Sequence, residues 1–397
     1  MAAKPVRRSA ERGVTTMSRK FDTRCIHGGE SHAYEDPIRA LSFPIYQTAT
    51  FAHSVIGHEQ FNYTRQDNPT RLRTEEILAS LEGAVQAVAF ASGMAAVAAL
   101  VELLSPGDHI LCSDDLYGGV TRLFNNICRK NALIVSFVVT TDTGAVARAI
   151  RPETKLLYIE TPSNPTMRVT DIRACAALAH ENGALLAVDN TFLTPVFQRP
   201  IELGADVVVH SGTKYLAGHN DTIAGFLALA DPALAEKIRL IGKSVGNMLS
   251  PFDSWLVLRG MKTLSIRMER AQESALKIVA ALRNMPRVSE VYYIGLEDHP
   301  GYAVNARQTG GSGAMISFRV DSETTARNAL QRVRLITFAE SLGGAESLIT
   351  YPITQTHNDV PHEQRARLGI DERLLRLSVG LEDADDLIED LSQALGV

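Results

Sequence analysis

Reactive side chains in this sequence stand where short apolar runs end. Asp189 closes one such run, Lys214 follows soon after another, and Tyr117 lies between two acidic residues and two glycines. Parallel strands end at a common edge of their sheet, and ligands bind beyond that edge. We therefore expect a carboxylate, an amine and an aromatic ring to meet at one strand edge.

Each of these three residues has an ordinary structural interpretation beside a chemical one. A carboxylate such as Asp189 is costly to bury without a cation, and a protonated ring nitrogen would serve as that cation. Lys214 could be a surface lysine, but a desolvated lysine forms Schiff bases with aldehydes. Tyr117 could fill a turn, or it could stack on a planar cofactor.

Small and hydroxyl-bearing residues near the same edge suit a phosphate group. Ser92, Gly93 and Met94 open a predicted helix, whose free N–H groups can bind a phosphate, although a Ser-Gly step more often only caps a helix. Ser211 and Thr213 add hydroxyl groups just before Lys214. Pyridoxal 5′-phosphate (PLP) is a planar, phosphorylated pyridine aldehyde, so it accounts for all of these groups together. The sequence predicts a PLP site.

The elements that position these residues follow from the spacing of apolar side chains. From about residue 85 to 215, β-branched runs alternate with amphipathic stretches, which is typical of a buried, mostly parallel sheet with crossover helices. The predicted strands are Val85–Ala91, His109–Cys112, Ile134–Val139, Leu156–Ile159, Ala184–Val188 and Asp206–Val209, with helices over Met94–Leu104 and Ile172–Asn182. Helical patterns over Ala233–Ile241 and Trp255–Leu282 then lead to shorter runs at Val288–Tyr293, Ala314–Val320 and Leu335–Phe338. The sequence predicts an α/β fold with a smaller α+β C-terminal domain.

The chain divides into four expected segments. Residues 1–20 form a basic tail, 21–62 an irregular N-terminal arm, 63–256 the large cofactor-binding domain and 257–397 the small domain. The tail has the basic bias of disordered extensions and of organelle transit peptides, and it lacks the apolar core of a secretory signal. We expect an unstructured upstream extension, with Met17 as a second candidate start.

Composition excludes several classes of protein. The 397 residues are 45% apolar and 21% charged, with no apolar run of the roughly 18–20 residues that a membrane span needs. The net charge of −5, without a basic stripe, makes nucleic acid an unlikely partner. The four cysteines form no CxxC pair, so we expect neither a metal site nor disulfides, and we expect a cytoplasmic protein.

Motifs spread over the chain resemble the cystathionine γ-synthase/γ-lyase family of PLP-dependent trans-sulfuration enzymes, which has the fold-type I (aspartate aminotransferase-like) architecture. The resemblance runs in family order from about residue 24 to the C-terminus, and only the basic tail lies outside it. The matching segments are Tyr63-Thr64-Arg65 with Asn68-Pro69-Thr70, Ala91-Ser92-Gly93-Met94-Ala95, Asp115-Leu116-Tyr117-Gly118-Gly119, Glu160-Thr161-Pro162-Ser163-Asn164-Pro165, Val188-Asp189-Asn190-Thr191-Phe192, His210-Ser211-Gly212-Thr213-Lys214-Tyr215, Glu340-Ser341-Leu342-Gly343-Gly344 and Arg376-Leu377-Ser378-Val379-Gly380.

The resemblance implies a role for each matched residue. Lys214 would bond the cofactor and move protons, Asp189 would hold its ring nitrogen, and Tyr117 would assist the chemistry. The cofactor-binding set it implies is Tyr63, Arg65, Ser92, Gly93, Met94, Tyr117, Asn164, Asp189, Ser211, Thr213 and Lys214, and the substrate-binding set is Glu340, Ser341 and Arg376. Arg376 would clamp the substrate α-carboxylate, although a partly buried ion pair is its plain alternative. Tyr63 and Arg65 would reach a neighbouring subunit's cofactor, in a homotetramer built as a dimer of dimers.

The implied activity is γ-elimination or γ-replacement on sulfur amino acids or homoserine derivatives. Gly119 and Glu340 favour cystathionine γ-lyase or γ-synthase, whereas the stretch 351–357 resembles some bacterial cystathionine β-lyases, so that a β-lyase or a sulfhydrylase stays open. A non-catalytic binding protein on the same scaffold would be expected to lack Lys214 or Asp189. The SxxK motif ending at Lys214 lacks the partner motifs of serine acyl-enzymes, and no GxGxxG motif opens a first βα turn.

Overall fold

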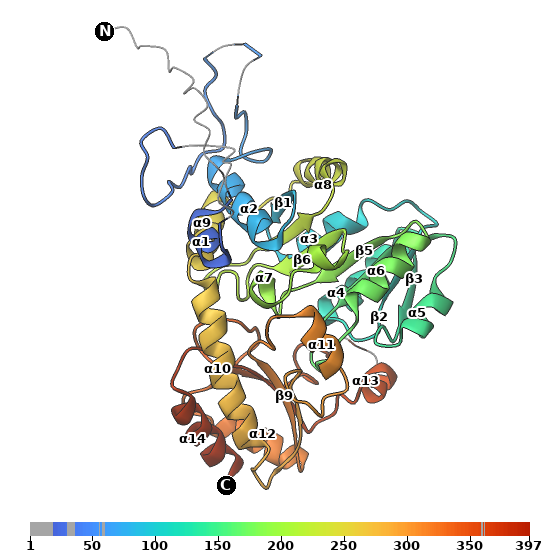
Figure 1. Cartoon of the computed structure of the whole chain (residues 1–397), viewed down its shortest axis with the longest axis vertical. Helices are drawn as coiled ribbons and strands as arrows, with labels where there is room; N and C mark the ends of the chain where they lie inside the picture. The colour runs from blue at the N-terminus through green and yellow to red at the C-terminus, as the bar shows by residue number, and fades with distance from the viewer. Residues whose placement is uncertain (1–18, 30–35, 55, 58–59, 359, 361) are drawn as a thin grey trace.

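The computed structural model describes residues 19–29, 36–54, 56–57, 60–358, 360 and 362–397 (Figure 1). The expected unstructured tail lies outside the described residues, except for its last two positions. Two sheets organise the chain, and the long helix α10 (Leu264–Leu282) runs beside the second of them. The division of the chain at residue 256 into a large and a small domain stays a prediction.

The first sheet has seven strands in the order β1-β7-β6-β5-β4-β2-β3. Its strands are β1 (Gln86–Phe90), β2 (His109–Ser113), β3 (Ile134–Val138), β4 (Thr154–Glu160), β5 (Leu185–Asp189), β6 (Val207–Ser211) and β7 (Gly225–Leu229). Strands β3, β2, β4, β5 and β6 run parallel, whereas β7 lies antiparallel between β1 and β6. The expected mostly parallel sheet is therefore confirmed.

Helices cover both faces of this sheet. Leu156 and Tyr158 point into one apolar cluster with the helices at 93–101, 118–122 and 232–245. Leu157 and Ile159 point into another with the helices at 143–149 and 172–181, as the alternation of side chains along a strand requires. The helices of this part are α1 (Phe21–His27), α2 (Pro69–Glu82), α3 (Gly93–Val101), α4 (Gly118–Arg122), α5 (Thr143–Ala149), α6 (Ile172–Glu181), α7 (Thr194–Phe197), α8 (Pro232–Val245) and α9 (Pro251–Met261), with a π-helical turn at Leu123–Cys128 and a 3₁₀ turn at Pro200–Leu203.

The second sheet has five strands in the order β10-β11-β12-β9-β8, mostly antiparallel. Its strands are β8 (Val288–Tyr292), β9 (Met315–Val320), β10 (Thr337–Phe338), β11 (Leu348–Thr350) and β12 (Leu374–Ser378). The remaining helices are α11 (Tyr302–Gln308), α12 (Glu323–Arg332), α13 (His362–Leu368) and α14 (Ala384–Leu395). Helices α10, α12 and α14 pack together beside β9 (Figure 1).

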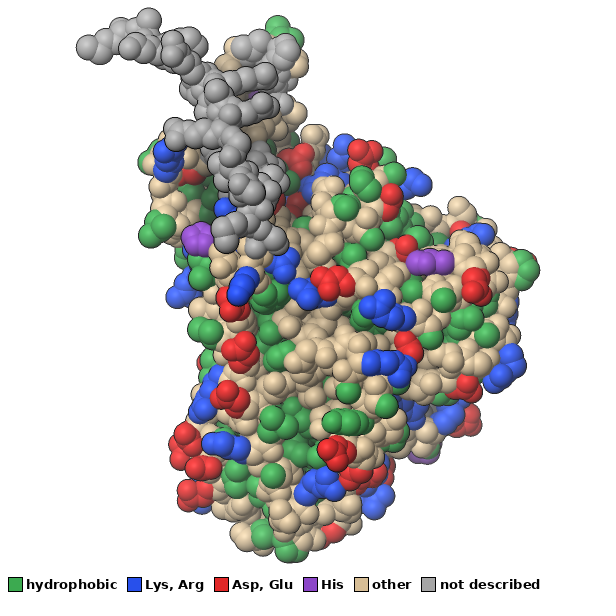
Figure 2. Space-filling model, viewed as in Figure 1, with side chains coloured by type: hydrophobic (Ala, Val, Ile, Leu, Met, Phe, Trp, Pro, Cys, Tyr) green, Lys and Arg blue, Asp and Glu red, His purple; other side chains and the backbone are tan. Residues whose placement is uncertain are grey.

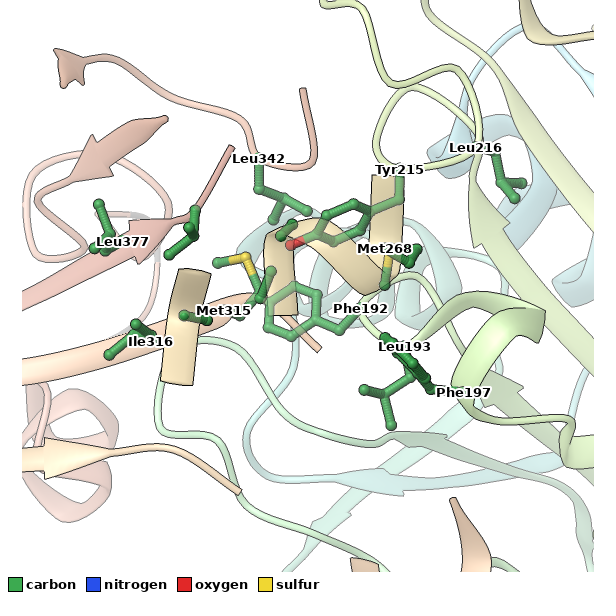
Figure 3. Packing of buried hydrophobic residues seen from close by; sticks show 14 of the residues in the cluster. Phe192, Leu193, Phe197, Tyr215, Leu216, Met268, Met315, Ile316, Leu342 and Leu377 are labelled. Atoms are coloured by element: carbon green, nitrogen blue, oxygen red, sulfur yellow. The ribbon is translucent and has the colours of Figure 1, made fainter. Parts of the chain in front are cut away.

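One continuous hydrophobic cluster joins the two sheets. Phe192 and Tyr215 come from loops that follow β5 and β6, Met268 comes from α10, and Met315 and Leu377 come from the second sheet; all five are buried in the same cluster (Figure 3). Apolar contact of this kind is the main stabilising force in folding. It fixes the second sheet beside the strand ends of the first.

Several expectations about the elements were wrong or incomplete. The predicted helix Trp255–Leu282 breaks at Thr263, whose side chain donates to the Gly260 carbonyl and so competes with the helix hydrogen bonds. Only part of Leu335–Phe338 is a strand, and α1 lies within the arm expected to be irregular. Sequence analysis missed α2, because polar residues such as Arg71, Thr74 and Glu75 are buried on its packed sides, so that polar and apolar residues do not separate onto two faces. It also missed β7, a short run between glycine and leucine.

Basic and acidic side chains are interspersed over the face of the molecule in Figure 2. In the part of the chain that the structure describes, none of the helices has the length and apolarity needed to span a membrane.

Gly225 of β7 allows the start of α3 to approach the sheet closely. Gly225 pairs with Phe90 on one side and with Ser211 on the other. A Cβ added at Gly225 would lie 2.0 Å from the carbonyl oxygen of Ser92, far inside van der Waals contact. The absence of a side chain at Gly225 therefore allows Ser92, and the helix that follows it, to lie close to β7.

We predict that Gly225→Ala destabilises the protein by about 1–3 kcal/mol, because the Ser92 backbone must move to admit the methyl group. Thermal unfolding midpoints of this variant and of Gly310→Ala measure the effect. The second variant is a matched control, since a Cβ at Gly310 meets only one atom, at 3.9 Å. Equal midpoints for the two variants would contradict the close packing of β7 against Ser92.

Candidate active site

A cavity of about 320 Å³ opens at the carboxyl ends of the first sheet's strands and is closed by segments of the second. It brings together every predicted site residue except Tyr63 and Arg65. Those lining it are Ser92, Gly93, Met94, Tyr117, Asn164, Asp189, Ser211, Thr213, Lys214, Glu340, Ser341 and Arg376. The strand-edge argument therefore located the cavity correctly.

One end of the cavity is suited to a phosphate. Ser92 caps α3 by accepting a hydrogen bond from the Ala95 N–H at 3.0 Å. The first N–H groups of a helix, here those of Gly93 and Met94, have no partner within the helix. A Cβ at Gly93 would lie 3.0 Å from the Cβ of Ser211, so glycine lets this helix start lie close against the end of β6 without a shift of either segment. The helix start, its positive dipole end and the nearby hydroxyl group of Ser211 form a cradle for an anion.

Asp189 ends β5 with its carboxyl group directed into the cavity. Oδ1 accepts from the Thr191 N–H at 3.0 Å, and Oδ2 accepts from the Tyr158 hydroxyl at 3.3 Å. Burial raises the pKa of Asp189, because the interior disfavours its charge, while the hydrogen bonds to Thr191 act in the opposite direction. A cation placed against this carboxylate would stabilise its charged form.

Glu160 lies beside Asp189 in register on the neighbouring strand. Burial and the charge of Asp189 raise the pKa of Glu160. Its Oε2 accepts from the N–H of Tyr117 at 2.9 Å, which fixes the backbone of Tyr117 directly before α4. Our site prediction left Glu160 out, although it ends an apolar strand as Asp189 does, and that shared signal could have identified it.

Lys214 lies in the loop after β6, with its amine inside the cavity. Nζ donates to Ser341 Oγ at 2.7 Å. Burial and, after it, the charge of Arg376 lower the pKa of Lys214 to about 8, against the opposing effect of Glu340. A larger fraction of this amine than of an ordinary lysine is therefore neutral and nucleophilic near neutral pH, as attack on an aldehyde requires.

Arg376 of β12 is one of the largest fully buried side chains in the protein. Nη1 donates to Asn164 Oδ1 at 2.8 Å, and Nη2 donates to the Ser341 carbonyl at 2.9 Å and to Thr350 Oγ1 at 3.1 Å. Its buried Nε has no hydrogen-bond partner among the described residues. Burial lowers the pKa of Arg376 to about 10. A bound carboxylate would give Nε a hydrogen-bond acceptor and the guanidinium an opposite charge.

Tyr63 and Arg65 lie apart from this cavity. The guanidinium of Arg65 sits 5.5 Å from the centre of the Tyr63 ring and donates to the carbonyl of Lys243. Tyr63 is 42% exposed, so the pair faces outward from this chain. Other cavity residues that sequence analysis did not single out include Thr191, two positions after Asp189, and Thr356.

The donor set fits PLP. A helix start suits its phosphate, a buried carboxyl group suits its ring nitrogen, and the neutral amine of Lys214 suits its aldehyde carbon. Within the described residues, no group of three or more His, Cys, Asp or Glu side chains could hold a metal ion.

Comparisons with known proteins agree with this chemistry. The chain is 45% identical to cystathionine γ-lyase of Bacillus subtilis, over 95% of this chain and 99% of the relative. It is also 45% identical to a cystathionine β-lyase of Lactococcus lactis, over 94% and 98% of the two chains. The crystal structure of cystathionine γ-lyase from Lactobacillus plantarum in complex with L-serine superposes with a TM-score of 0.93, at 42% identity, over 95% of this chain and 99% of that one.

The matches at this level confirm the expected fold-type I architecture. A family model described as Cys/Met metabolism PLP-dependent enzyme covers residues 22–396, which is nearly the whole chain outside the tail. The cavity, its charged side chains and these matches have a single explanation: the chain belongs to the family of PLP-dependent enzymes of cysteine and methionine metabolism.

Proposed function

We propose that this enzyme catalyses γ-elimination or γ-replacement on cystathionine-sized sulfur amino acids or homoserine derivatives, with cystathionine γ-lyase or γ-synthase activity. The observation that carries the proposal is the position of Glu340. Its carboxylate shares the cavity with Lys214 and Arg376. Cystathionine has a second amino group far from the reacting carbon, and a carboxylate inside the cavity could receive that distal ammonium.

The charged residues of the cavity would have separate roles in the reaction. Arg376, held by Asn164, would bind the substrate α-carboxylate, and Asp189 would keep a proton on the cofactor's ring nitrogen. PLP, when bound, supplies an electron sink for the pair released at the substrate Cα. The amine of Lys214 would take the Cα proton, and its hydrogen bond to Ser341 would aim it. Tyr117 would cover the cofactor ring and assist proton transfer to the leaving group.

The phosphate would bind the N–H groups of Gly93 and Met94 together with the hydroxyls of Ser211 and Thr213. These residues share the cavity lining with Lys214. Binding at a helix start needs no side-chain charge, because the N–H groups and the helix dipole favour an anion. Arg65 and Tyr63 of a second subunit would add a cation and a hydroxyl to the same phosphate.

Cystathionine β-lyase activity is the second candidate. The β-lyase of Lactococcus lactis is as similar to this chain as the γ-lyase of Bacillus subtilis is. Thr356, from the stretch that resembles some β-lyases, lines the cavity. The two activities differ in the substrate carbon that loses its sulfur.

A product assay distinguishes the candidates. We predict that cystathionine yields 2-oxobutyrate, ammonia and cysteine, or that an activated homoserine ester and cysteine yield cystathionine. Glu340→Gln should raise KM for cystathionine by about tenfold, because a charged contact to the distal ammonium is lost, and should leave KM for homocysteine nearly unchanged. Pyruvate and homocysteine as the main products would establish the β-lyase instead. Borohydride reduction and peptide mapping of the same preparation should tag Lys214.

We further propose a homotetramer, built as a dimer of dimers, whose active sites are shared within each dimer. Ile38, Leu41 and Ile56 of the arm are 85%, 97% and 96% exposed, which is unusual for large apolar side chains in one region. Tyr63 and Arg65 follow the arm and point away from their own cavity. A second copy of the chain would bury the arm and receive this pair.

Subunit complementation tests the shared site. We predict that Arg65→Ala and Lys214→Ala subunits, each with little activity alone, regain activity after mixing under conditions that allow exchange. A mixed dimer would then hold one site with both defects and one with neither, so that its activity approaches about half of the parent's. If each site is built from one chain only, every site keeps a defect and the mixture stays inactive.

We place the enzyme in the cytoplasm. All four cysteines are buried and unpaired, which supports a reducing compartment.

A further inference from the structure

His357 lies behind the wall of the cavity, and the mechanism above gives it no role. The side chain is 0% exposed, and its neighbour Thr356 lines the cavity. Nδ1 lies 2.8 Å from Thr356 Oγ1, whereas Nε2 has no hydrogen-bond partner of ordinary geometry among the described residues. A buried polar atom of this kind costs free energy and therefore requires an explanation.

The surroundings of the ring identify its protonation state. The backbones of Leu116 and Asn164 both raise the pKa of His357, as carbonyl oxygens do when they face an N–H group. Burial and then Arg376 have the larger, opposite effect and lower that pKa to about 4, so the ring is neutral at neutral pH. A neutral ring carries one N–H hydrogen. When the Thr356 hydroxyl donates to Nδ1, that hydrogen is on Nε2, which then faces the carbonyl oxygens of Leu116 and Asn164.

Both of these backbone neighbours lead directly into the active site. Leu116 precedes Tyr117, and the side chain of Asn164 accepts from Arg376 at 2.8 Å. The segment that carries His357 begins after Thr350, whose hydroxyl accepts from the same guanidinium at 3.1 Å. The chain from Thr350 to His357 therefore contacts Arg376 at one end, through Thr350, and faces the backbone of Asn164 at the other, through His357.

The segment also packs tightly against the start of α4, directly after Tyr117. A Cβ added at Gly118 would lie 2.3 Å from the carbonyl oxygen of Thr356. The amide of His357 donates to the Pro352 carbonyl at 2.9 Å, which closes the segment on itself. Backbone contact brings the two loops together, and the imidazole is the polar group that reaches from one to the other.

We propose that His357 is a positioning residue: its imidazole N–H holds the backbones of Leu116 and Asn164, and thereby fixes Tyr117 and the Asn164–Arg376 pair that binds the substrate carboxylate. The inference rests on the proposed function, because it assigns Arg376 to the substrate. It predicts that loss of the imidazole weakens substrate binding while Lys214 still bonds the cofactor.

Three variants separate positioning from plain stability. His357→Phe keeps a ring of similar size but removes both nitrogens, and His357→Gln returns an N–H group at a comparable reach. His109→Phe is the matched control. His109 is also 0% exposed, has Nδ1 2.7 Å from Thr154 Oγ1 and has a buried Nε2 without a partner among the described residues, but it begins β2 at the sheet edge opposite the cavity.

We expect His357→Phe to raise KM for the parent's best sulfur amino acid by about tenfold, as the loss of buried hydrogen bonds implies. The KM should recover substantially in His357→Gln and should change less than about twofold in His109→Phe. Affinity for the α-carboxamide of the same amino acid, followed by visible absorption, should be equal in the parent and in His357→Phe, because the amide lacks the carboxylate that Arg376 binds.

Borohydride tagging of Lys214 distinguishes a failure of this proposal from a failure of the proposed function. A parent enzyme without a tag at Lys214 would refute the proposed function itself, whereas His357→Phe should keep the tag. The positioning role is refuted if His357→Phe and His109→Phe change KM equally, or if His357→Gln is no better than His357→Phe. Should His357→Phe fail to fold, Thr356→Val removes the hydroxyl that sets the ring's hydrogen, and an unchanged KM in that variant refutes the proposal as well.

Discussion

Buried charge without a partner is the constraint around which this molecule is built. Asp189 and Glu160 end neighbouring strands, and burial raises the pKa of both carboxyl groups. Across the cavity, burial lowers the pKa of Lys214 and of Arg376. No ion pair joins these carboxyl groups to these cations among the described residues. A ligand with a cationic ring nitrogen, an anionic phosphate and an anionic carboxylate supplies the missing charges, which is the combination that PLP and an amino acid bring together.

The fold maintains this arrangement through apolar packing and close backbone approaches. Gly225 and Gly93 allow the start of α3 to lie against the ends of β6 and β7. The cluster that includes Met268, Met315 and Leu377 (Figure 3) holds the second sheet over the strand ends. Arg376 and Lys214 therefore line the same cavity. Because these contacts are apolar, they can hold costly polar groups in place without hydrogen-bonding to them.

Sequence analysis found the cavity because strand ends carry a local signal. A charged residue that closes an apolar run, as Asp189 does, is visible without knowledge of the fold. The same rule would have found Glu160. It could not find the Asn164–Arg376 contact, since those residues are 212 positions apart and meet only through tertiary structure. Nor does a single sequence reveal that the imidazole of His357 is buried against the backbones of Leu116 and Asn164.

The missed elements have physical reasons as well. Helix α2 buries polar residues such as Arg71, Glu75 and Glu82, so its sequence lacks the separation of polar and apolar faces that marks a surface helix. Strand β7 begins with Gly225, a residue that disfavours strands in isolation but is required here by the close approach of Ser92. In both elements, packing overrides the local preference of the sequence.

Replacement of Asp189 by asparagine tests the central role of buried charge most directly. The amide has nearly the same volume, so the variant should fold, absorb visible light and carry the borohydride tag on Lys214. Without the carboxylate charge at the ring nitrogen, turnover should fall by at least about tenfold, since a charge-assisted hydrogen bond contributes roughly 1.5–3 kcal/mol. Turnover within about threefold of the parent, in a variant with the same cofactor content, would show that the charge of Asp189 is not what the site depends on.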